Sequence, residues 1–171
     1  MPFDVRRAQE SDGPALVELR RLLFRETSNM LWEPEEFTQT ARGESERIGR
    51  LNARRNCLVL LAEDAGLPVG LLTAVGGEVR RLRHSATLAL GVAKSHWGQG
   101  VASAMISEAK QWAWSAELHR LELTVHTTNL RALTVYLRAG FQIEGLRRAS
   151  LIVDGALVDE YLMSTLRSSQ P

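Results

Sequence analysis

Residues 86–102, ATLALGVAKSHWGQGVA, read in order as a buried strand, a glycine-containing loop and the beginning of a helix. The apolar strand ends near Val92, the loop contains Gly98 and Gly100, and apolar residues at helical spacing follow from Val101. A helix that begins directly after such a loop presents free backbone N–H groups and the positive end of its dipole, which together favour an anion. This segment therefore predicts a strand, loop and helix that bind a phosphate group.

Two common nucleotide-binding patterns do not fit this loop. The Walker pattern requires Gly-Lys-Ser/Thr at the end of the loop, which is absent here. The dinucleotide pattern G-x-G-x-x-G accommodates Gly98 and Gly100 but has Ser103 in place of its third glycine. The loop also follows a predicted hairpin late in the chain, whereas a dinucleotide fold places it first. A different phosphate-rich cofactor is indicated.

A second motif follows one strand later, from Asn129 to Phe141, with Tyr136 and Gly140 between them. Asn129 is typical of a helix cap, and Gly140 of a helix end. Asn129 and Tyr136 are two helical turns apart, a rise of about 10.5 Å, so both lie on one face of the helix. That face is able to contact an extended ligand twice. The alternative is that Asn129 only caps the helix and Tyr136 only packs.

The remaining elements follow from apolar periodicity and turn residues. A first strand, a helix after Pro14 and a second helix beginning with the acidic turn at 33–36 come before the loop. Two hairpins are expected, one with its turn at 64–68 and one at Asp154-Gly155, and strands are expected at 58–62, 69–75, 86–92 and 121–126.

Length and composition limit the class of protein. A chain of 171 residues and 19.0 kDa predicts a single domain over residues 1–171. A net charge of +1 argues against nucleic acid or an anionic membrane as the main partner. The single cysteine, Cys57, excludes an intramolecular disulfide, and no histidine has a partner at zinc-site spacing, so no metal is expected. Without an apolar stretch long enough for a membrane span or a signal peptide, the expected location is the cytoplasm.

Together, the two motifs resemble the GNAT superfamily of N-acyltransferases, which use acyl-coenzyme A. The family's loop has the form Arg/Gln-x-x-Gly-x-Gly/Ala, which residues 97–102 match except that Trp97 replaces the first residue. The second motif matches without a gap. The resemblance implies an α/β (α+β) fold: a mixed, mostly antiparallel sheet with a splay between two central parallel strands and helices on both faces. Segments at 120–125, 140–145 and 154–155 also resemble the bacterial amino-acid and phosphinothricin-type acetyltransferase subgroup.

The resemblance assigns the binding of acetyl-CoA to particular residues. Val92 would pair its backbone with the pantetheine arm, Asn129 would contact the same arm, and Tyr136 would face the thioester sulfur. The residues expected to hold the pyrophosphate are Gly98, Gln99, Gly100, Val101, Ala102 and Ser103.

Transfer of an acetyl group to an amine requires a proton acceptor and a proton donor. An alkylammonium, with a pKa of about 10.4, must lose a proton before it attacks, and the departing thiolate must gain one. Tyr136 is the expected general acid. Several family members carry a glutamate on the strand before the loop, but residues 86–89 contain no carboxylate. Glu122 and His84 are the remaining candidate bases, although Glu122 could instead pair with an arginine and His84 could belong to a solvated basic loop.

The acceptor is expected to bind near Glu26, Met30 and Trp32, which lie between the first two predicted helices. The expected reaction is direct transfer from acetyl-CoA to the primary amine of a small molecule in a ternary complex. Two alternatives stay open: acetylation of a protein N-terminus or lysine, and a non-catalytic acyl-CoA sensor. The strands around Asp154-Gly155 also suggest pairing between two copies in a homodimer.

Overall fold

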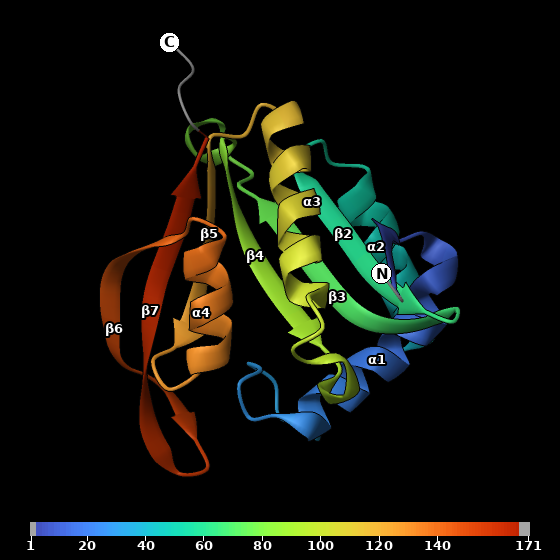
Figure 1. The fold of residues 1–171 in the computed structure, drawn as a ribbon. Helices are drawn as coiled ribbons and strands as arrows, with labels where there is room; N and C mark the ends of the chain where they lie inside the picture. Colours follow the sequence, from blue (N-terminus) through green and yellow to red (C-terminus); the bar gives the residue numbers. More distant parts are fainter. Residues whose placement is uncertain (1–2, 168–171) are drawn as a thin grey trace.

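The computed structural model describes residues 3–167 (Figure 1). The four helices are α1 (Gly13–Glu26), α2 (Ala41–Asn52), α3 (Val101–Ser115) and α4 (Leu130–Arg138). The seven strands are β1 (Asp4–Arg7), β2 (Cys57–Asp64), β3 (Leu67–Gly76), β4 (Ser85–Val92), β5 (Arg120–His126), β6 (Gln142–Val153) and β7 (Ala156–Leu166). All the strands join one sheet, in the order β1-β2-β3-β4-β5-β7-β6.

Strands β4 and β5 form the one parallel pair of this sheet, and every other neighbouring pair is antiparallel. Their pairing covers only Ser85–Thr87 against Arg120–Glu122. Beyond Thr87, β4 stays paired with β3 and β5 stays paired with β7, so the two strands separate. The expected splay between two central parallel strands is therefore confirmed. It leaves backbone groups on facing strand edges outside the sheet ladder, where an extended ligand can pair with them.

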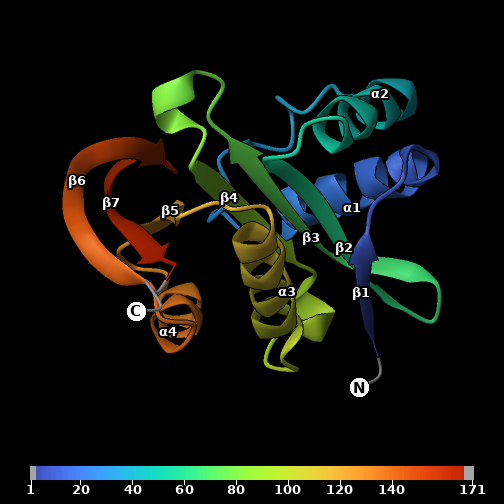
Figure 2. The same ribbon diagram turned by 90° about the horizontal axis from the view of Figure 1, so that it is seen from above.

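The helices cover both faces of the sheet, as expected: Figure 2 shows α1 and α2 on one face, and α3 and α4 on the other. The alternation of each strand divides the core accordingly. The larger cluster contains Leu72, Leu88 and Leu121 and packs against α3 and α4. The smaller cluster contains Val59 and Leu71 and packs against α1 and α2. The seam between α3 and α4 lies over the separating ends of β4 and β5 (Figures 1 and 2).

The expected start of the second helix was wrong. The acidic residues at 33–36 form a turn, and α2 begins at Ala41, where the Thr40 hydroxyl accepts a hydrogen bond from the Gly43 N–H at 3.1 Å. Phe37 packs edge-on against Phe24 of α1, with ring centroids 5.0 Å apart. This contact packs the segment between α1 and α2, which is not helical, against α1.

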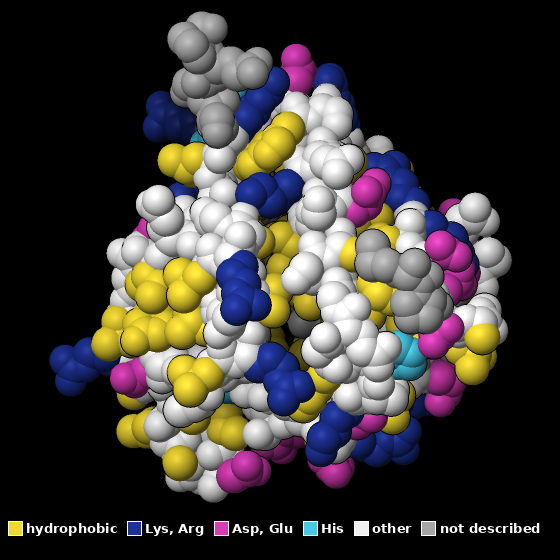
Figure 3. All heavy atoms as spheres, in the orientation of Figure 1, with side chains coloured by type: hydrophobic (Ala, Val, Ile, Leu, Met, Phe, Trp, Pro, Cys, Tyr) yellow, Lys and Arg dark blue, Asp and Glu magenta, His cyan; other side chains and the backbone are white. Residues whose placement is uncertain are grey.

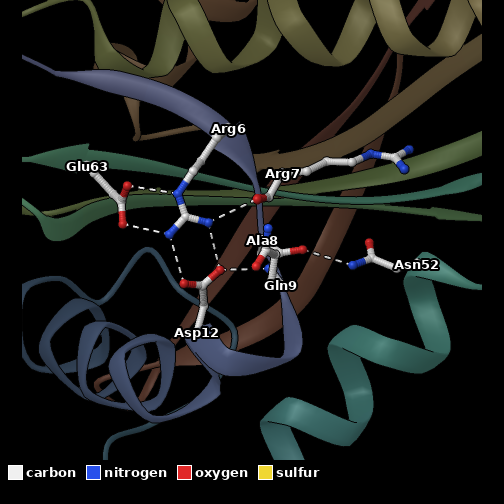
Figure 4. Close-up of polar contacts among 7 residues, drawn as sticks. All are labelled: Arg6, Arg7, Ala8, Gln9, Asp12, Asn52 and Glu63. Atoms are coloured by element: carbon white, nitrogen blue, oxygen red, sulfur yellow. Dashed lines mark hydrogen bonds and ion pairs between the residues drawn. The ribbon is translucent and has the colours of Figure 1, made fainter.

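Arg6 fixes the start of the chain to the sheet and to α1. Its guanidinium donates to Glu63 on β2 and to Asp12, each at 2.8 Å (Figure 4). The Arg6 guanidinium lowers the pKa of Asp12, and Asp12 also accepts the Gln9 N–H at 2.7 Å. On the other side of β1, the Asn52 amide donates to the carbonyl of Ala8 at 2.9 Å. These contacts orient α1, whose far end approaches the splayed strands.

Both predicted hairpins are present. Asp154 and Gly155 form a two-residue turn with φ values of 51° and 78°, which matches the twist of the paired strands. Strand β6 ends the sheet, and pairing of two copies through this edge stays a prediction. Within residues 3–167, no helix is long and apolar enough to cross a membrane.

Arg120 ties β5 to β6 and predicts a pH-dependent contribution to stability. It donates to both oxygens of Glu144, and together with the Ser164 hydroxyl it lowers the pKa of Glu144 from 4.5 to about 2. A carboxyl with a lowered folded-state pKa stabilises the fold above its unfolded pKa, and this stabilisation is lost as the pH falls through the folded value. We therefore expect Glu144→Gln to lower Tm at pH 7, where the half-exposed pair contributes under about 1 kcal/mol.

The difference in Tm between Glu144→Gln and the wild type should shrink as the pH is lowered through 2, because Glu144 then becomes protonated in the folded wild type as well. Thermal unfolding over this pH range measures it. Glu46→Gln, which removes an exposed i,i+4 pair with Arg42, is the matched control. A difference for Glu144→Gln that is constant with pH would contradict the assignment.

Candidate functional site

The loop before α3 has the backbone of an anion site. Gly98 and Gly100 adopt φ values of 76° and 87°, in the region that favours glycine, and a Cβ at either position would meet no atom within 4 Å. Gly100 is the N-cap of α3, and no side chain caps this helix. The N–H groups of the first turn, at residues 101–103, therefore point out of the helix toward an open space. This geometry suits the phosphates of a cofactor.

Two side chains of the loop are used to hold it in place. Gln99 donates from its side-chain amide to the Ser95 carbonyl at 2.9 Å, which turns this side chain toward the loop itself. His96 Nε2 lies 3.0 Å from Oδ2 of Asp64, the last residue of β2. The loop is therefore anchored from both sides and largely formed in advance.

Trp97, the residue that departs from the family's loop pattern, links the loop to β4 and α4. Its indole N–H donates to the Val92 carbonyl at 2.7 Å. The Arg131 guanidinium stacks on the indole ring at 4.4 Å from its centroid, and Lys94 Nζ lies 6.0 Å from it. Arg131 comes from the first turn of α4, so a cation from another element stands beside the loop.

A groove of about 570 Å³ runs between α3 and α4. Figure 3 shows Lys and Arg side chains over this seam with hydrophobic side chains deeper within it. Lys110 and Arg138 supply positive charge, and Lys110 donates to the Ala139 carbonyl at 2.7 Å. Ser103, one of the expected cofactor residues, also lines the groove, which connects the phosphate loop to the second motif.

Helix α4 places Asn129 and Tyr136 as the spacing predicts, two turns apart. The Asn129 side-chain oxygen accepts the Ala132 N–H at 3.2 Å and caps the helix, which leaves its amide N–H₂ group to donate elsewhere. Tyr136 is 8% exposed and packs on Phe141, with ring centroids 5.8 Å apart. Burial raises the pKa of Tyr136 to about 12. Its hydroxyl therefore stays protonated at neutral pH and is able to act as a proton donor.

The two candidate bases lie away from the open end of the splay. Glu122 sits at the last paired position, opposite Thr87, and its carboxylate accepts Arg120 Nε at 2.8 Å. His84 precedes β4, and its carbonyl accepts the His119 and Arg120 N–H groups. The length of β4, roughly 23 Å, separates His84 from Val92. The structure therefore places both residues toward the paired end of β4, and their role as bases stays a prediction.

Two of the three residues expected on the acceptor side, Glu26 and Met30, contact the open end of β4 or the segment that follows it. Glu26, at the end of α1, accepts a hydrogen bond from the Lys94 N–H at 2.7 Å, so its carboxylate binds the segment that follows β4. Met30 approaches Gly91 on β4, where its Cε lies 3.4 Å from the position a Cβ would take. Trp32 is 52% exposed. Of the three, Met30 reaches the strand that faces the splay.

The sequence interpretation did not include Arg131, which the structure places over the Trp97 ring beside the loop; only the absence of the family's polar first residue at Trp97 could have drawn attention to cations nearby. For metals, no grouping of three or more His, Cys, Asp or Glu side chains in the described part of the chain is arranged to hold an ion.

Comparisons with known proteins agree with this geometry. A family model described as Acetyltransferase (GNAT) family matches residues 16–141. The L-amino acid N-acetyltransferase AaaT of Escherichia coli strain K12 is 33% identical over 120 residues, which are 69% of this chain and 74% of that protein. The streptothricin acetyltransferase of Escherichia coli is 38% identical over 55 residues, 32% of each chain.

Solved structures share the fold over almost the whole chain. A GNAT-family acetyltransferase from Streptococcus pneumoniae superposes with a TM-score of 0.94 at 28% identity, covering 96% of this chain and 99% of its own. The acetyltransferase yncA from Salmonella typhimurium, solved with acetyl-CoA, superposes with a TM-score of 0.84 at 17% identity, covering 99% and 96%. The family match, the relative and the fold confirm the expected enzyme class: this chain belongs to the GNAT family of acetyltransferases.

Proposed function

We propose that this enzyme transfers the acetyl group of acetyl-CoA directly to the primary amine of a small molecule, an amino acid or a related amine. The observation that carries the proposal is the opening between β4 and β5, which has the glycine loop at its end and Tyr136 on the helix that covers it. The similarity to an L-amino acid N-acetyltransferase supports the amino-acid class, and the small net charge of +1 is consistent with a small acceptor.

The residues present fit the donor along its whole length. The N–H groups of the loop at 98–103 bind the pyrophosphate, and Arg131 supplies the positive charge that Trp97 does not. The pantetheine arm lies in the splay, where it pairs with the backbone at Val92 and receives a hydrogen bond from Asn129. A Val92 carbonyl that already accepts the Trp97 indole still has a second lone pair for the arm.

Tyr136, on α4, is the residue to which we assign protonation of the leaving thiolate. The thiolate that leaves the acetyl group needs a proton, and the Tyr136 hydroxyl is protonated over the whole neutral range because burial raises its pKa to about 12. Transfer is direct, because Cys57 is fully buried in β2, within the sheet, and lies outside the splay.

The test is thiol release from acetyl-CoA with a panel of L-amino acids, polyamines, aminoglycosides and short peptides, after calorimetry has measured acetyl-CoA binding. We expect turnover confined to one class of small amine. Turnover with peptides alone would instead establish a protein acceptor, and tight binding of acetyl-CoA without turnover on any acceptor would establish a sensor.

We expect Arg131→Ala to weaken acetyl-CoA binding by about 3- to 10-fold, because it removes one charge-assisted contact at a solvent-exposed site. The loss should decline as salt is raised, since exposed charges are screened. Calorimetry at two ionic strengths measures both effects, and Arg42→Ala, on α2, is the matched control. Equal affinities for Arg131→Ala and the wild type at low salt would show that Arg131 only stacks on Trp97.

A further inference from the structure

The register of the sheet brings His126 and Glu160 together on the side of the splay that faces α1. Thr87 pairs with Glu122, so Gly91, four residues further along β4, lies level with His126 across the gap. His126 pairs with Glu160 on β7. Leu23 of α1 and Met30, which follows α1, lie against Gly91 on the face where its side chain would point. This face of the splay is therefore the one that faces α1. The pair is therefore at the open end of the splay, level with the backbone just before the phosphate loop.

Both side chains are buried in a way that the fold alone does not require. His126 and Glu160 are each 6% exposed. Among residues 3–167, only Glu44 is a second buried carboxylate, and it is paired with both Arg20 and Arg47. Glu160 has one partner, Arg147, which reaches a single oxygen at 3.2 Å. A largely buried carboxylate with a single arginine partner keeps lone pairs free to accept hydrogen bonds from a ligand, which makes this pair a site to test.

No direct hydrogen bond or ion pair joins His126 to Glu160, although both side chains lie in the described range and share one face as cross-strand neighbours. Cross-strand neighbours have Cβ atoms about 4.5–5.5 Å apart, so the two functional groups are close enough to contact one and the same amine nitrogen. The other charged groups nearby are engaged elsewhere: Glu122 with Arg120, and Glu26 with the Lys94 N–H.

On the basis of the proposed function, we propose that Glu160 binds the ammonium group of the acceptor and that His126 accepts its proton. The ammonium gives one proton to the His126 imidazole, which passes it to solvent. The neutral nitrogen then forms a C–N bond with the acetyl carbonyl carbon, and the C–S bond breaks. The thiolate takes a proton from the Tyr136 hydroxyl. The nitrogen, now bonded to the acetyl group, loses its second proton, and this proton restores the Tyr136 hydroxyl. The products are an N-acetyl amine and free coenzyme A. Glu122 and His84 are then not required as bases.

The first test compares His126→Gln, Glu160→Gln and Glu122→Gln with the wild type on the best amine of the panel, over a pH series. We expect His126→Gln to lower kcat by about 10²–10³ and to remove the acidic limb of the pH profile, with the acetyl-CoA affinity unchanged. Glu160→Gln should chiefly raise KM for the amine, by about 10-fold or more. His119→Gln, an exposed histidine at the far end of the sheet, is the matched control. A loss in Glu122→Gln with full activity in His126→Gln would overturn the proposal.

The second test does not depend on turnover. In the wild type saturated with coenzyme A, the imidazole NMR signals of His126, assigned by their absence in His126→Gln, should move when ethylammonium is added, and should not move in Glu160→Gln. Unmoved signals in the wild type would overturn the proposal. If the wild type releases no thiol with any amine, the proposed function fails, and the His126 signals alone then decide this inference.

Discussion

Replacing Tyr136 with Phe should lower kcat by about 10²–10⁴ while leaving the affinity for acetyl-CoA nearly unchanged. The substitution removes only a hydroxyl, so the packing of the ring on Phe141 is kept. The expected loss is large because no other acidic group on α4 is placed to protonate the leaving thiolate. Steady-state kinetics with calorimetry of acetyl-CoA binding measures both quantities.

The pH dependence of the wild type provides a second check on Tyr136. With a pKa of about 12, its hydroxyl should cause no decline of the rate below about pH 11. Tyr161→Phe, on β7, is the matched control because it removes the other tyrosine hydroxyl of the chain. An unaltered rate in Tyr136→Phe would mean that water or the substrate protonates the thiolate.

Phe141→Ala should lower the free energy of unfolding by about 3–5 kcal/mol. Phe141 is 2% exposed, lies in the larger core cluster and directly follows the turn that ends α4. Because folded domains are stable by only about 5–15 kcal/mol, this is a large share of the total. Urea denaturation of Phe141→Ala and of Leu130→Ala, which truncates an exposed leucine on the same helix, measures it.

A loss smaller than about 1 kcal/mol for Phe141→Ala would show that neighbouring side chains close the cavity. Phe141→Leu should be intermediate, because it leaves a smaller cavity. Since the Phe141 ring supports Tyr136, we also expect the folded Phe141→Ala protein to lose turnover, in contrast to Leu130→Ala.

The features that were predicted correctly depend on local chemistry. The glycine-containing loop between β4 and α3 follows from turn residues and apolar periodicity, and the alignment of Asn129 with Tyr136 follows from helical periodicity. The alternative that Glu122 pairs with an arginine also came from local alternation, and the structure shows that pair.

The features that were missed depend on contacts between distant segments. The segment at 33–36 resembles the start of a helix, but the packing of Phe37 on Phe24 of α1 holds it outside a helix. The proximity of His126 and Glu160 depends on the register between β5 and β7, which are far apart in sequence. No periodicity within either segment encodes that register.

The short contact between β4 and β5 means that the free enzyme carries two sheet edges inside its own fold. Exposed edges invite a strand from another molecule, and this is a common origin of aggregation. At the end of β4, the Trp97 indole N–H donates to the Val92 carbonyl, and the Arg131 guanidinium stacks on the indole ring. The residue that departs from the family's loop pattern thus leaves fewer free acceptors at the end of β4 while no donor is bound.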